Sequence, residues 1–472
     1  MPTTRMPHTL LLLFAVQIMA LVAAWTLPQG EFDRVTNEAG REQVVAGTFH
    51  EVSAERPGFL RLFTAIPDGF AAAGDIIFFV LIIGGSFGVL RATGALDALI
   101  ASVLRRFGHR PGWLIFGGVT LFAAGSSTIG MAEEYIPFVP VLLTLCLALR
   151  FDAITAVGIL YCGCAVGYGV AVMNPFTLIV AQEVAGLPPT SGMAYRLALS
   201  VVFIAIAAHH VWRYALRIRH DPAQSLVADI PSPAKPIDTG NGSMSAFERV
   251  ILGITGCGIG VVIWGLSQAS GWHWYVREMG GLFLGLAVAY GIAAAAFRRA
   301  APRSVPDGLT PNRMAEAFCT GAAELTTTAM LIGFARAILI LLEEGKVVDT
   351  IVHGLAVPLS QAGPGIAAVG MLAVQTLTNF FIPSGSGQAY VTMPIMAPLA
   401  DLTGVTRQTA VLAFQFGDGF SNILVPTNAV LIGILSIARI PYDRWLRFIL
   451  PFMFKVWLAA SIALGVAVWM GY

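Results

Sequence analysis

Charged residues are scarce in this chain: Asp, Glu, Lys and Arg make up 12% of its 472 residues, where a soluble domain carries roughly 25%. The formal net charge is +1 and no lysine- or arginine-rich tract occurs, which excludes the phosphate-neutralising surface of a nucleic-acid-binding protein. Cysteine is also rare. The five cysteines fall in apolar segments, and Cys162-Gly-Cys164 lacks the second ligand pair of a zinc site, so we interpret them as small buried hydrophobes.

The rest of the composition is strongly apolar. Hydrophobic residues make up 56% of the chain, and apolar stretches close to the ~20 residues that cross a bilayer recur from end to end. We therefore predict an all-α polytopic membrane protein with the lipid bilayer as its solvent. The predicted spans are 8–27, 75–90, 153–186, 195–216, 249–268, 281–297, 317–342, 408–438 and 445–470. The first is kept as a helix and not as a cleaved signal, because its apolar core has the length of a full span.

Basic residues set the predicted orientation. They concentrate in the loops 91–110, 213–219, 298–303 and 439–447, which the positive-inside rule places in the cytoplasm. The N-terminus is then cytoplasmic and the C-terminus periplasmic, in a multi-pass protein of the cell inner membrane. The stretch 220–246, rich in proline, serine, glycine and aspartate, is predicted to be a cytoplasmic linker between two halves.

Two apolar stretches differ from ordinary spans. In 113–149, two short apolar segments flank the polar run 125–134, and Arg110 and Arg150 bracket the unit, so both of its ends are expected in the cytoplasm. In 366–400, two apolar segments flank Pro383-Ser-Gly-Ser-Gly-Gln388, and the topology puts both ends outside. Lipid cannot hydrogen-bond unwound backbone, so each polar tip is expected to line a protein or water-filled cavity. We predict two re-entrant hairpins that enter from opposite faces.

The two halves also match weakly in sequence at a constant offset of 254 residues. The matched pairs include Glu134 with Gln388, Pro140 with Pro394, Gly163 with Gly417 and Asn174 with Asn428. The predicted organisation is an N-terminal helix and periplasmic loop (1–72), a first inverted repeat (73–219), the linker (220–246), scaffold helices (247–315) and a second inverted repeat with the final helix (316–472). Inverted repeats imply alternating access.

The helix after each hairpin, 153–186 or 408–438, is predicted to break at its middle. Proline lies in both breaks, Met173-Asn-Pro-Phe-Thr177 and Val425-Pro-Thr-Asn428, and proline frees a carbonyl group. Half-helix N-termini attract a carboxylate, while freed carbonyls and Ser, Thr or Asn oxygens coordinate a cation such as Na⁺. The polar candidates for solute binding are Ser126, Ser127, Thr128, Asn174, Thr177, Ser384, Ser386, Gln388, Asn422, Thr427 and Asn428. Of these, Ser127, Asn174, Ser386 and Asn428 are the candidate Na⁺ ligands, and the alternative role of each residue is close helix packing.

Three carboxylates complete the predicted solute site. A carboxylate at the centre of a membrane helix costs about 2.5 kcal/mol or more, so it marks a functional position. Glu133 and Glu134 lie at the first tip, and Asp418 lies just before the second break. They either bind an ammonium group, carry a coupling proton or complete a cation shell. The structural alternative is that one of them caps N–H groups of its own hairpin.

Several of these strings carry a family resemblance. They include Gly125-Ser-Ser-Thr-Ile-Gly-Met-Ala-Glu-Glu134, Asn379-Phe-Phe-Ile-Pro-Ser-Gly-Ser-Gly-Gln-Ala389 and Phe414-Gln-Phe-Gly-Asp-Gly-Phe420. Over almost its whole length, the chain resembles the YfcC family, within the anaerobic C4-dicarboxylate carrier group of the ion transporter superfamily. The resemblance implies a homodimer, with a scaffold domain at the interface and a transport domain that slides as an elevator. It also implies coupling to Na⁺ or H⁺, or exchange of one solute for another. Members of the group are labelled as dicarboxylate carriers, basic amino acid antiporters or peptide-like transporters.

The predicted function is transport, by ion-coupled symport or antiport, of a small polar organic solute; neither an enzyme nor a cofactor is expected. The acidic residues favour an amino acid or a related carboxylate. A C4-dicarboxylate is the alternative, although the Ser-Asn-Thr signature of related sodium-dicarboxylate carriers is replaced here by Ser126-Ser-Thr128 and Ser384-Gly-Ser386. An intramembrane protease with Ser386 as its nucleophile is a remote alternative. A serine nucleophile needs a base within hydrogen-bond reach, and the sequence indicates none for Ser386. A passive channel would need a continuous pore.

Overall fold

The computed structural model describes residues 9–36, 42–45, 47–107, 110–128, 130–174, 176–231, 244–266, 274, 276–302, 305–306 and 308–472. The chain is mostly helical, as predicted. Its α-helices are α1 (Thr9–Thr26), α2 (Arg61–Ala72), α3 (Gly74–Ala92), α4 (Ala95–Phe107), α5 (Pro111–Thr128), α6 (Phe138–Ala148), α7 (Ala153–Gly169), α8 (Leu178–Val184), α9 (Met193–His220), α10 (Ala246–Leu266), α11 (Val276–Ala300), α12 (Pro311–Glu324), α13 (Thr326–Glu344), α14 (Val348–Ala356), α15 (Pro364–Phe381), α16 (Gly385–Thr403), α17 (Arg407–Ser421), α18 (Ala429–Ile437) and α19 (Tyr442–Met470). Short 3-10 turns include η1 (Glu133–Tyr135), η2 (Pro222–Gln224) and η5 (Val357–Gln361).

Helices long and apolar enough to cross a membrane recur along the chain. Within the described ranges there are six: Gly74–Ala92, Met193–His220, Arg277–Ala300, Pro311–Glu344, Pro364–Phe381 and Tyr442–Met470. The last of the predicted spans, 445–470, thus corresponds to α19, and 195–216 to α9. Because α15 is among the six, it has the length to cross by itself, and the re-entrant course of 366–400 remains a prediction.

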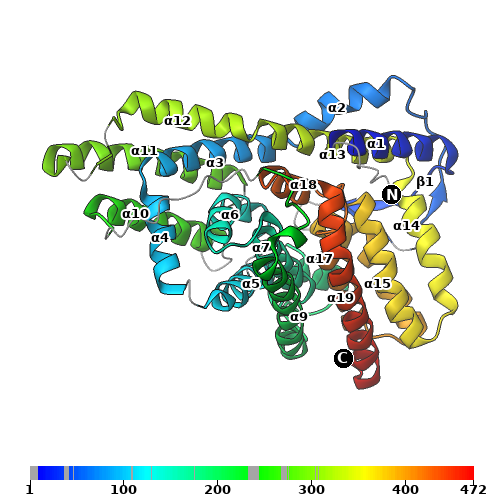
Figure 1. Ribbon diagram of the computed structural model, residues 1–472. Helices are drawn as coiled ribbons and strands as arrows, with labels where there is room; N and C mark the ends of the chain where they lie inside the picture. Colours follow the sequence, from blue (N-terminus) through cyan, green and yellow to red (C-terminus); the bar gives the residue numbers. More distant parts are fainter. Residues whose placement is uncertain are drawn as a thin grey trace.

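One group of helices lies across the top of the view in Figure 1, and another runs down it. The upper group contains α1, α3, α11, α12 and α13, whereas α9, α15 and α19 run downward. In the upper group, α2 and α3 meet at Ala73 and pack against α13 and α12, which meet at Leu325. Glycine permits the close crossing: a Cβ on Gly321 would lie 2.2 Å from the carbonyl oxygen of Gly84.

The predicted span 317–342 lies within the membrane-length stretch Pro311–Glu344. A local change of backbone conformation at Leu325, which the apolar sequence does not indicate, divides this stretch into α12 and α13. Helix α2 was not predicted, because Pro67 and Asp68 interrupt its apolar pattern. Helices α4 and α14 were also not predicted, since both lie in segments interpreted as loops.

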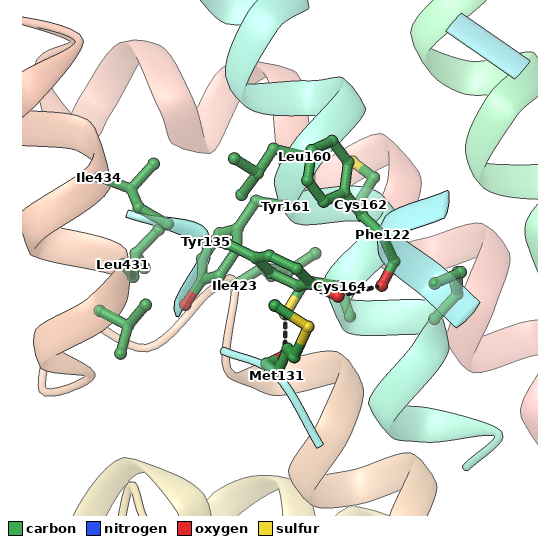
Figure 2. Close-up of a cluster of buried hydrophobic side chains, with 14 of the residues drawn as sticks. Phe122, Met131, Tyr135, Leu160, Tyr161, Cys162, Cys164, Ile423, Leu431 and Ile434 are labelled. Atoms are coloured by element: carbon green, nitrogen blue, oxygen red, sulfur yellow. Dashed lines mark hydrogen bonds between the residues drawn. The ribbon is translucent and has the colours of Figure 1, made fainter. Parts of the chain in front are cut away.

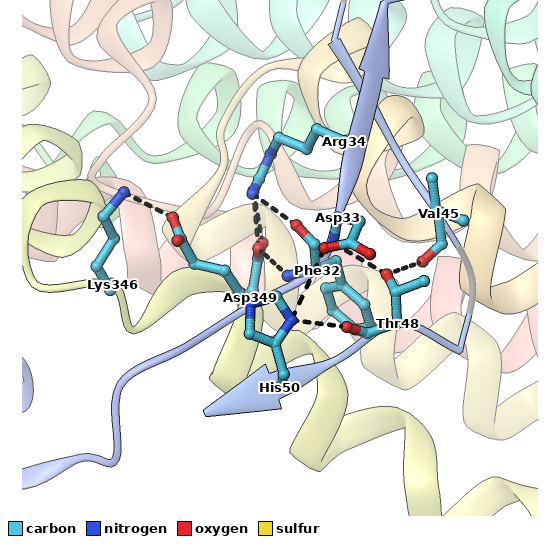
Figure 3. A network of polar contacts seen from close by, with 9 residues as sticks. Phe32, Asp33, Arg34, Val45, Thr48, His50, Lys346 and Asp349 are labelled. Carbon is cyan, nitrogen blue, oxygen red and sulfur yellow. Dashed lines mark hydrogen bonds and ion pairs between the residues drawn. The ribbon is translucent and has the colours of Figure 1, made fainter. Parts of the chain in front are cut away.

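The loop between α1 and α2 contains short strands, so the chain is not purely α-helical. Strand β1 (Gly30–Glu31) pairs with β4 (His50–Glu51), and β2 (Arg34–Thr36) pairs with β3 (Glu42–Val44), both antiparallel. Figure 3 shows how this loop is tied to the start of α14: Arg34 donates to both carboxylate oxygens of Asp349 at 2.8 and 2.9 Å. Lys346 also pairs with Glu31 at 2.6 Å.

The centre of the lower group is formed by α7 and α17. Nearly every residue of both helices is buried, which is typical of a helix surrounded by other helices. Helix α7 packs against α5, and α17 packs against α15, in each case through a glycine. A Cβ on Gly163 would lie 2.7 Å from the carbonyl oxygen of Val119, and one on Gly417 would lie 2.3 Å from Cβ of Gln375. Gly163 and Gly417, matched in the sequence, therefore have the same packing role.

Candidate solute site at the junction of two interrupted helices

The predicted break in the first half is present. Helix α7 ends at Gly169 and α8 begins at Leu178. Between them, the Asn174 side-chain oxygen accepts the backbone N–H groups of Phe176 and Thr177 at 2.9 and 3.1 Å, which satisfies donors at the start of α8. The Asn174 amide nitrogen donates to the carbonyl oxygen of Ser126 at 2.9 Å. Asn174 thus holds the turn before the second half-helix and connects the break to the first tip.

The first tip is folded against this break. The Ser127 hydroxyl accepts the N–H group of Val172 at 3.0 Å, and the Tyr168 hydroxyl donates to the carbonyl oxygen of Gly130 at 2.6 Å. Gly130 has a φ of 80°, and a Cβ there would lie 2.6 Å from the Phe176 ring, so glycine is required.

Ser126 and Thr128 hydrogen-bond within the first hairpin itself. Ser126 is buried and donates to the carbonyl oxygen of Met131 at 2.8 Å. Thr128 is exposed and bonds back to Ala124 of its own helix. Thr128 is therefore oriented by its helix and not by the break.

The two glutamates of the first tip lie in η1. Glu134 is 5% exposed and accepts the backbone N–H group of Ala132 at 2.7 Å, so one of its oxygens caps its own hairpin. Glu133 is half-buried. Neither glutamate forms an ion pair with a Lys, Arg or His of the described segments. The tip therefore holds two acidic groups without a cationic side chain.

The second tip reaches the break of the first half. Helix α16 begins at Gly385, and a Cβ there would lie 2.4 Å from Thr177 Cγ2 and 3.1 Å from Asp418 Oδ2. Ser384 caps the helix by accepting the Gly387 N–H group at 3.4 Å, and Ser386 is half-buried.

Gln388 holds the two arms of the second hairpin together. Its amide nitrogen donates to the carbonyl and side-chain oxygens of Gln375 at 2.9 and 2.7 Å. Gln375 lies on α15 and Gln388 on α16, so the hydrogen bonds fix one arm to the other.

The second predicted break is also present. Helix α17 ends at Ser421, and α18 begins at Ala429. The Asn428 side-chain oxygen accepts the Leu431 N–H group at 2.9 Å and the Tyr161 hydroxyl at 3.2 Å, and its nitrogen donates to Asn422 Oδ1 at 3.0 Å. Asn428 is the N-cap of α18, whereas Asn174, its match at the offset of 254, lies three residues before Thr177, the N-cap of α8.

The second break also contacts the second hairpin. The Thr427 hydroxyl donates to the carbonyl oxygen of Phe380, near the end of α15, at 2.7 Å. The hairpin and the break of the second half are therefore joined, as they are in the first half.

The two breaks meet where α7 and α17 cross. A Cβ on Gly419 would lie 2.3 Å from the backbone nitrogen of Gly169, and Gln415 and Thr177 side chains are 3.2 Å apart. Figure 2 shows the apolar side of this junction, where Tyr161 of α7 lies between Tyr135 of the first hairpin and Leu431 of α18. Both tips and both breaks thus surround one region.

Sequence reasoning missed one central residue, Asn379. It is fully buried near the end of α15, and its amide nitrogen donates to Ser421 Oγ at 2.8 Å, to Asn422 Oδ1 at 3.1 Å and to the carbonyl oxygen of Asp418 at 3.2 Å. The signal for it was available, because Asn379 is the first residue of the string 379–389 that carries the family resemblance.

The predicted Na⁺ ligands already have hydrogen-bond partners. The side-chain oxygens of Ser127, Asn174 and Asn428 each accept hydrogen bonds from backbone N–H groups. An oxygen that accepts such bonds has fewer lone pairs left for a cation. This set of ligands remains a prediction that no observation tests.

Residues 6–469 match the profile of the DcuC family, described as C4-dicarboxylate anaerobic carrier. The chain is 33% identical over 507 aligned positions to an Escherichia coli protein named "Putative basic amino acid antiporter YfcC", covering 100% of this chain and 98% of that one. It is 27% identical to an uncharacterized protein of Haemophilus influenzae, covering 99% of this chain and 97% of the other.

Among solved structures, the YdaH transporter of Alcanivorax borkumensis is similar with a TM-score of 0.44 and 18% identity, over 99% of both chains. MtrF of Neisseria gonorrhoeae, described as belonging to a class of antimetabolite efflux pumps, is similar with a TM-score of 0.42 and 16% identity. That match covers 98% of this chain and 95% of MtrF.

Proposed function

Because the chain belongs to the DcuC family of C4-dicarboxylate anaerobic carriers, we propose that it is a secondary active transporter of a small amine-bearing solute, an amino acid or a related carboxylate. The family membership predicted from the sequence is thereby confirmed, and the apolar helices make the chain a multi-pass membrane protein. The solute, its coupling and its route belong to the proposal.

The acidic character of the junction is the observation that supports an amine-bearing solute. Glu133, Glu134 and Asp418 lie at the junction, and none forms an ion pair with a described Lys, Arg or His. Glu134 is 5% exposed and Asp418 is fully buried. An ammonium group supplies the missing positive charge, whereas a dicarboxylate adds like charge at short range. The relative whose name describes a basic amino acid antiporter agrees with this choice.

The mechanism we propose is alternating access in an elevator. The junction, with both hairpins, moves as the transport body against the upper group of helices, in a homodimer within the inner membrane. A gradient of Na⁺ or H⁺, or exchange for a second solute, drives the movement. The arrangement of breaks and tips supports this mechanism, because discontinuous helices around a midplane site are typical of such carriers.

A C4-dicarboxylate is the second candidate, because it is the substrate that the family description names. The N-termini of α8, α16 and α18 carry the positive ends of their helix dipoles. The N-terminus of α16, which is the longest of the three helices, lies at the second tip and can attract an anion there. An intramembrane protease is disfavoured: no hydrogen bond within the described part of the chain joins Ser386 to a histidine.

Counterflow in proteoliposomes tests the proposal. Purified protein is reconstituted, loaded with lysine, a neutral amino acid or succinate, and supplied with the same labelled solute outside, with and without a Na⁺ gradient. We expect saturable uptake of an amine-bearing solute and a loss of about tenfold in Glu133→Gln, the equivalent of roughly 1.4 kcal/mol. Glu324→Gln, which removes an exposed partner of Arg91, is the matched control and should keep full uptake. Counterflow of succinate alone would refute the amine-bearing solute.

A further inference from the structure

Asp418 is a buried carboxylate with no compensating partner. It is fully buried, and neither of its oxygens has a well-formed hydrogen bond or an ion pair in the part of the chain that the structure describes; the side chain that approaches it is the neutral amide of Asn422. Burying a carboxylate without a partner costs desolvation free energy, so buried carboxylates in folded proteins are usually paired with a charged group or bind a cation.

Three helix ends lie around this point, the C-terminal ends of α17 and α15 and the N-terminal end of α16. Asp418 lies in the last turn of α17, and Asn379 lies in the last turn of α15. Both are negative dipole ends, where cations are stabilised and carboxylates are not. The α16 N-terminus at Gly385 is close, but none of its N–H groups donates to Asp418 in the described segments, and Ser384 accepts the N–H groups of Gly387 and Gln388.

Asn379 adds a second free oxygen. Its amide nitrogen donates to Ser421, Asn422 and the Asp418 backbone, so the orientation of the amide is fixed by three acceptors. Its Oδ1 therefore faces away from them, and it is buried without a donor among the described residues. Carboxylate and amide oxygens without donors are the ligands that hard cations take.

This arrangement exists in only one of the two repeats. At the offset of 254, Asn379, Asp418 and Ser421 correspond to Gly125, Cys164 and Gly167. The equal packing roles of Gly163 and Gly417 support that register. Cys164 lies in the apolar cluster of Figure 2, beside Met131. The polar set is thus an addition to the second half and not a general requirement of the crossing.

We propose that Asp418 and Asn379 form a sodium site, with Asp418 Oδ1 and Oδ2 and Asn379 Oδ1 as side-chain ligands. The inference rests on the proposed transport function, in which this ion is the driving cation. It uses residues of α15 and α17 in the second half in place of the Ser127, Asn174, Ser386 and Asn428 set. One member of that set is a close neighbour, since Asn428 and Asn379 donate to the same Asn422 oxygen at 3.0 and 3.1 Å. The proposed sodium site also leaves Glu133 for the amine of the solute.

Sodium binding is measured without any solute. The full chain, purified in detergent, is unfolded thermally in rising NaCl, with choline chloride keeping the ionic strength constant, and binding of labelled Na⁺ is measured in parallel. Ligand that binds only the folded protein raises the unfolding temperature with concentration. We expect such a rise for the wild type and for Asp401→Asn, which removes an exposed carboxylate paired with Arg407.

Asp418→Asn should lose both the rise in unfolding temperature and the labelled Na⁺, and Asn379→Leu should weaken Na⁺ binding tenfold or more. If Asp418→Asn does not fold, Asp418→Glu keeps the charge and should shift the Na⁺ concentration at half-effect. A wild type that ignores Na⁺ but responds to pH, or an Asp418→Asn protein that binds Na⁺ normally, would overturn the site. These Na⁺-binding measurements are independent of the counterflow assay. Failure of the sodium site can therefore be distinguished from failure of the proposed transport function.

Discussion

Gly419→Ala is expected to destabilise the protein by separating α7 from α17 at their crossing. The new Cβ would lie 2.3 Å from the Gly169 nitrogen, 2.7 Å from its Cα and 2.7 Å from the Tyr168 carbonyl carbon. All three are backbone atoms, which cannot rotate away. Because ordinary contacts begin at 3.4 Å, the helices must separate by about 1 Å, and overpacking of this kind costs roughly 1–3 kcal/mol.

The control is Gly256→Ala, in the middle of α10. A Cβ there meets nothing within 4 Å, and alanine in a helix interior is favoured over glycine by about 0.5–1 kcal/mol. Thermal unfolding of both purified variants, followed by tryptophan fluorescence, should show a fall of several degrees for Gly419→Ala and no fall for Gly256→Ala. Equal unfolding temperatures would refute the close crossing. Uptake should fall with Gly419→Ala, because both breaks flank this crossing.

Other changes test the remaining contacts. Asn174→Ala should destabilise the protein by about 1–2 kcal/mol and reduce uptake, because it removes the hydrogen bonds to the Phe176 and Thr177 N–H groups and to Ser126; unfolding and counterflow measure both effects. Asp152→Ala should increase proteolysis of residues 222–231, since Asp152 caps α7 and accepts from both the Tyr214 and Ser225 hydroxyls at 2.6 and 2.7 Å; an unchanged digest would contradict this. Arg34→Ala should loosen the loop between α1 and α2 without affecting Na⁺ binding, as checked by hydrogen exchange of residues 30–36.

The sequence allowed good prediction of features that have a direct local cause. Proline and asparagine in polar runs predicted both helix breaks. The structure shows Asn428 capping α18 and Asn174 bonded to two N–H groups within the first break. The convergence of tips and breaks was predicted from the repeat, because the same register applies to both halves. The family was predicted from long matching stretches of sequence, which are more specific than any short motif.

Other features depend on long-range packing and had no local signal. The joint at Leu325 lies in continuous apolar sequence, and its position depends on how α12 and α13 pack against α3 and α2. The hydrogen bonds from Val172 N–H to Ser127 and from the Asn174 nitrogen to Ser126 could not be predicted, because their partners lie more than 40 residues away in the chain. Asn379 was missed because a single asparagine in an apolar helix is usually a packing residue.

A disulfide between the second tip and the first break tests the joint site most directly. A Cβ on Gly385 would lie 3.5 Å from Thr177 Cβ, within the range that a disulfide spans. In a background without the native cysteines, Gly385→Cys with Thr177→Cys is oxidised mildly, and the chain is cut at a protease site inserted within residues 232–243.

We expect the two halves of the Gly385→Cys, Thr177→Cys protein to stay joined until a reductant is added. The control pair, Thr177→Cys with Leu402→Cys at the far end of α16, about 25 Å further along the helix, should separate at once. Two halves that separate equally in both proteins would show that the second tip does not reach the first break, and a single site built from both repeats would be wrong.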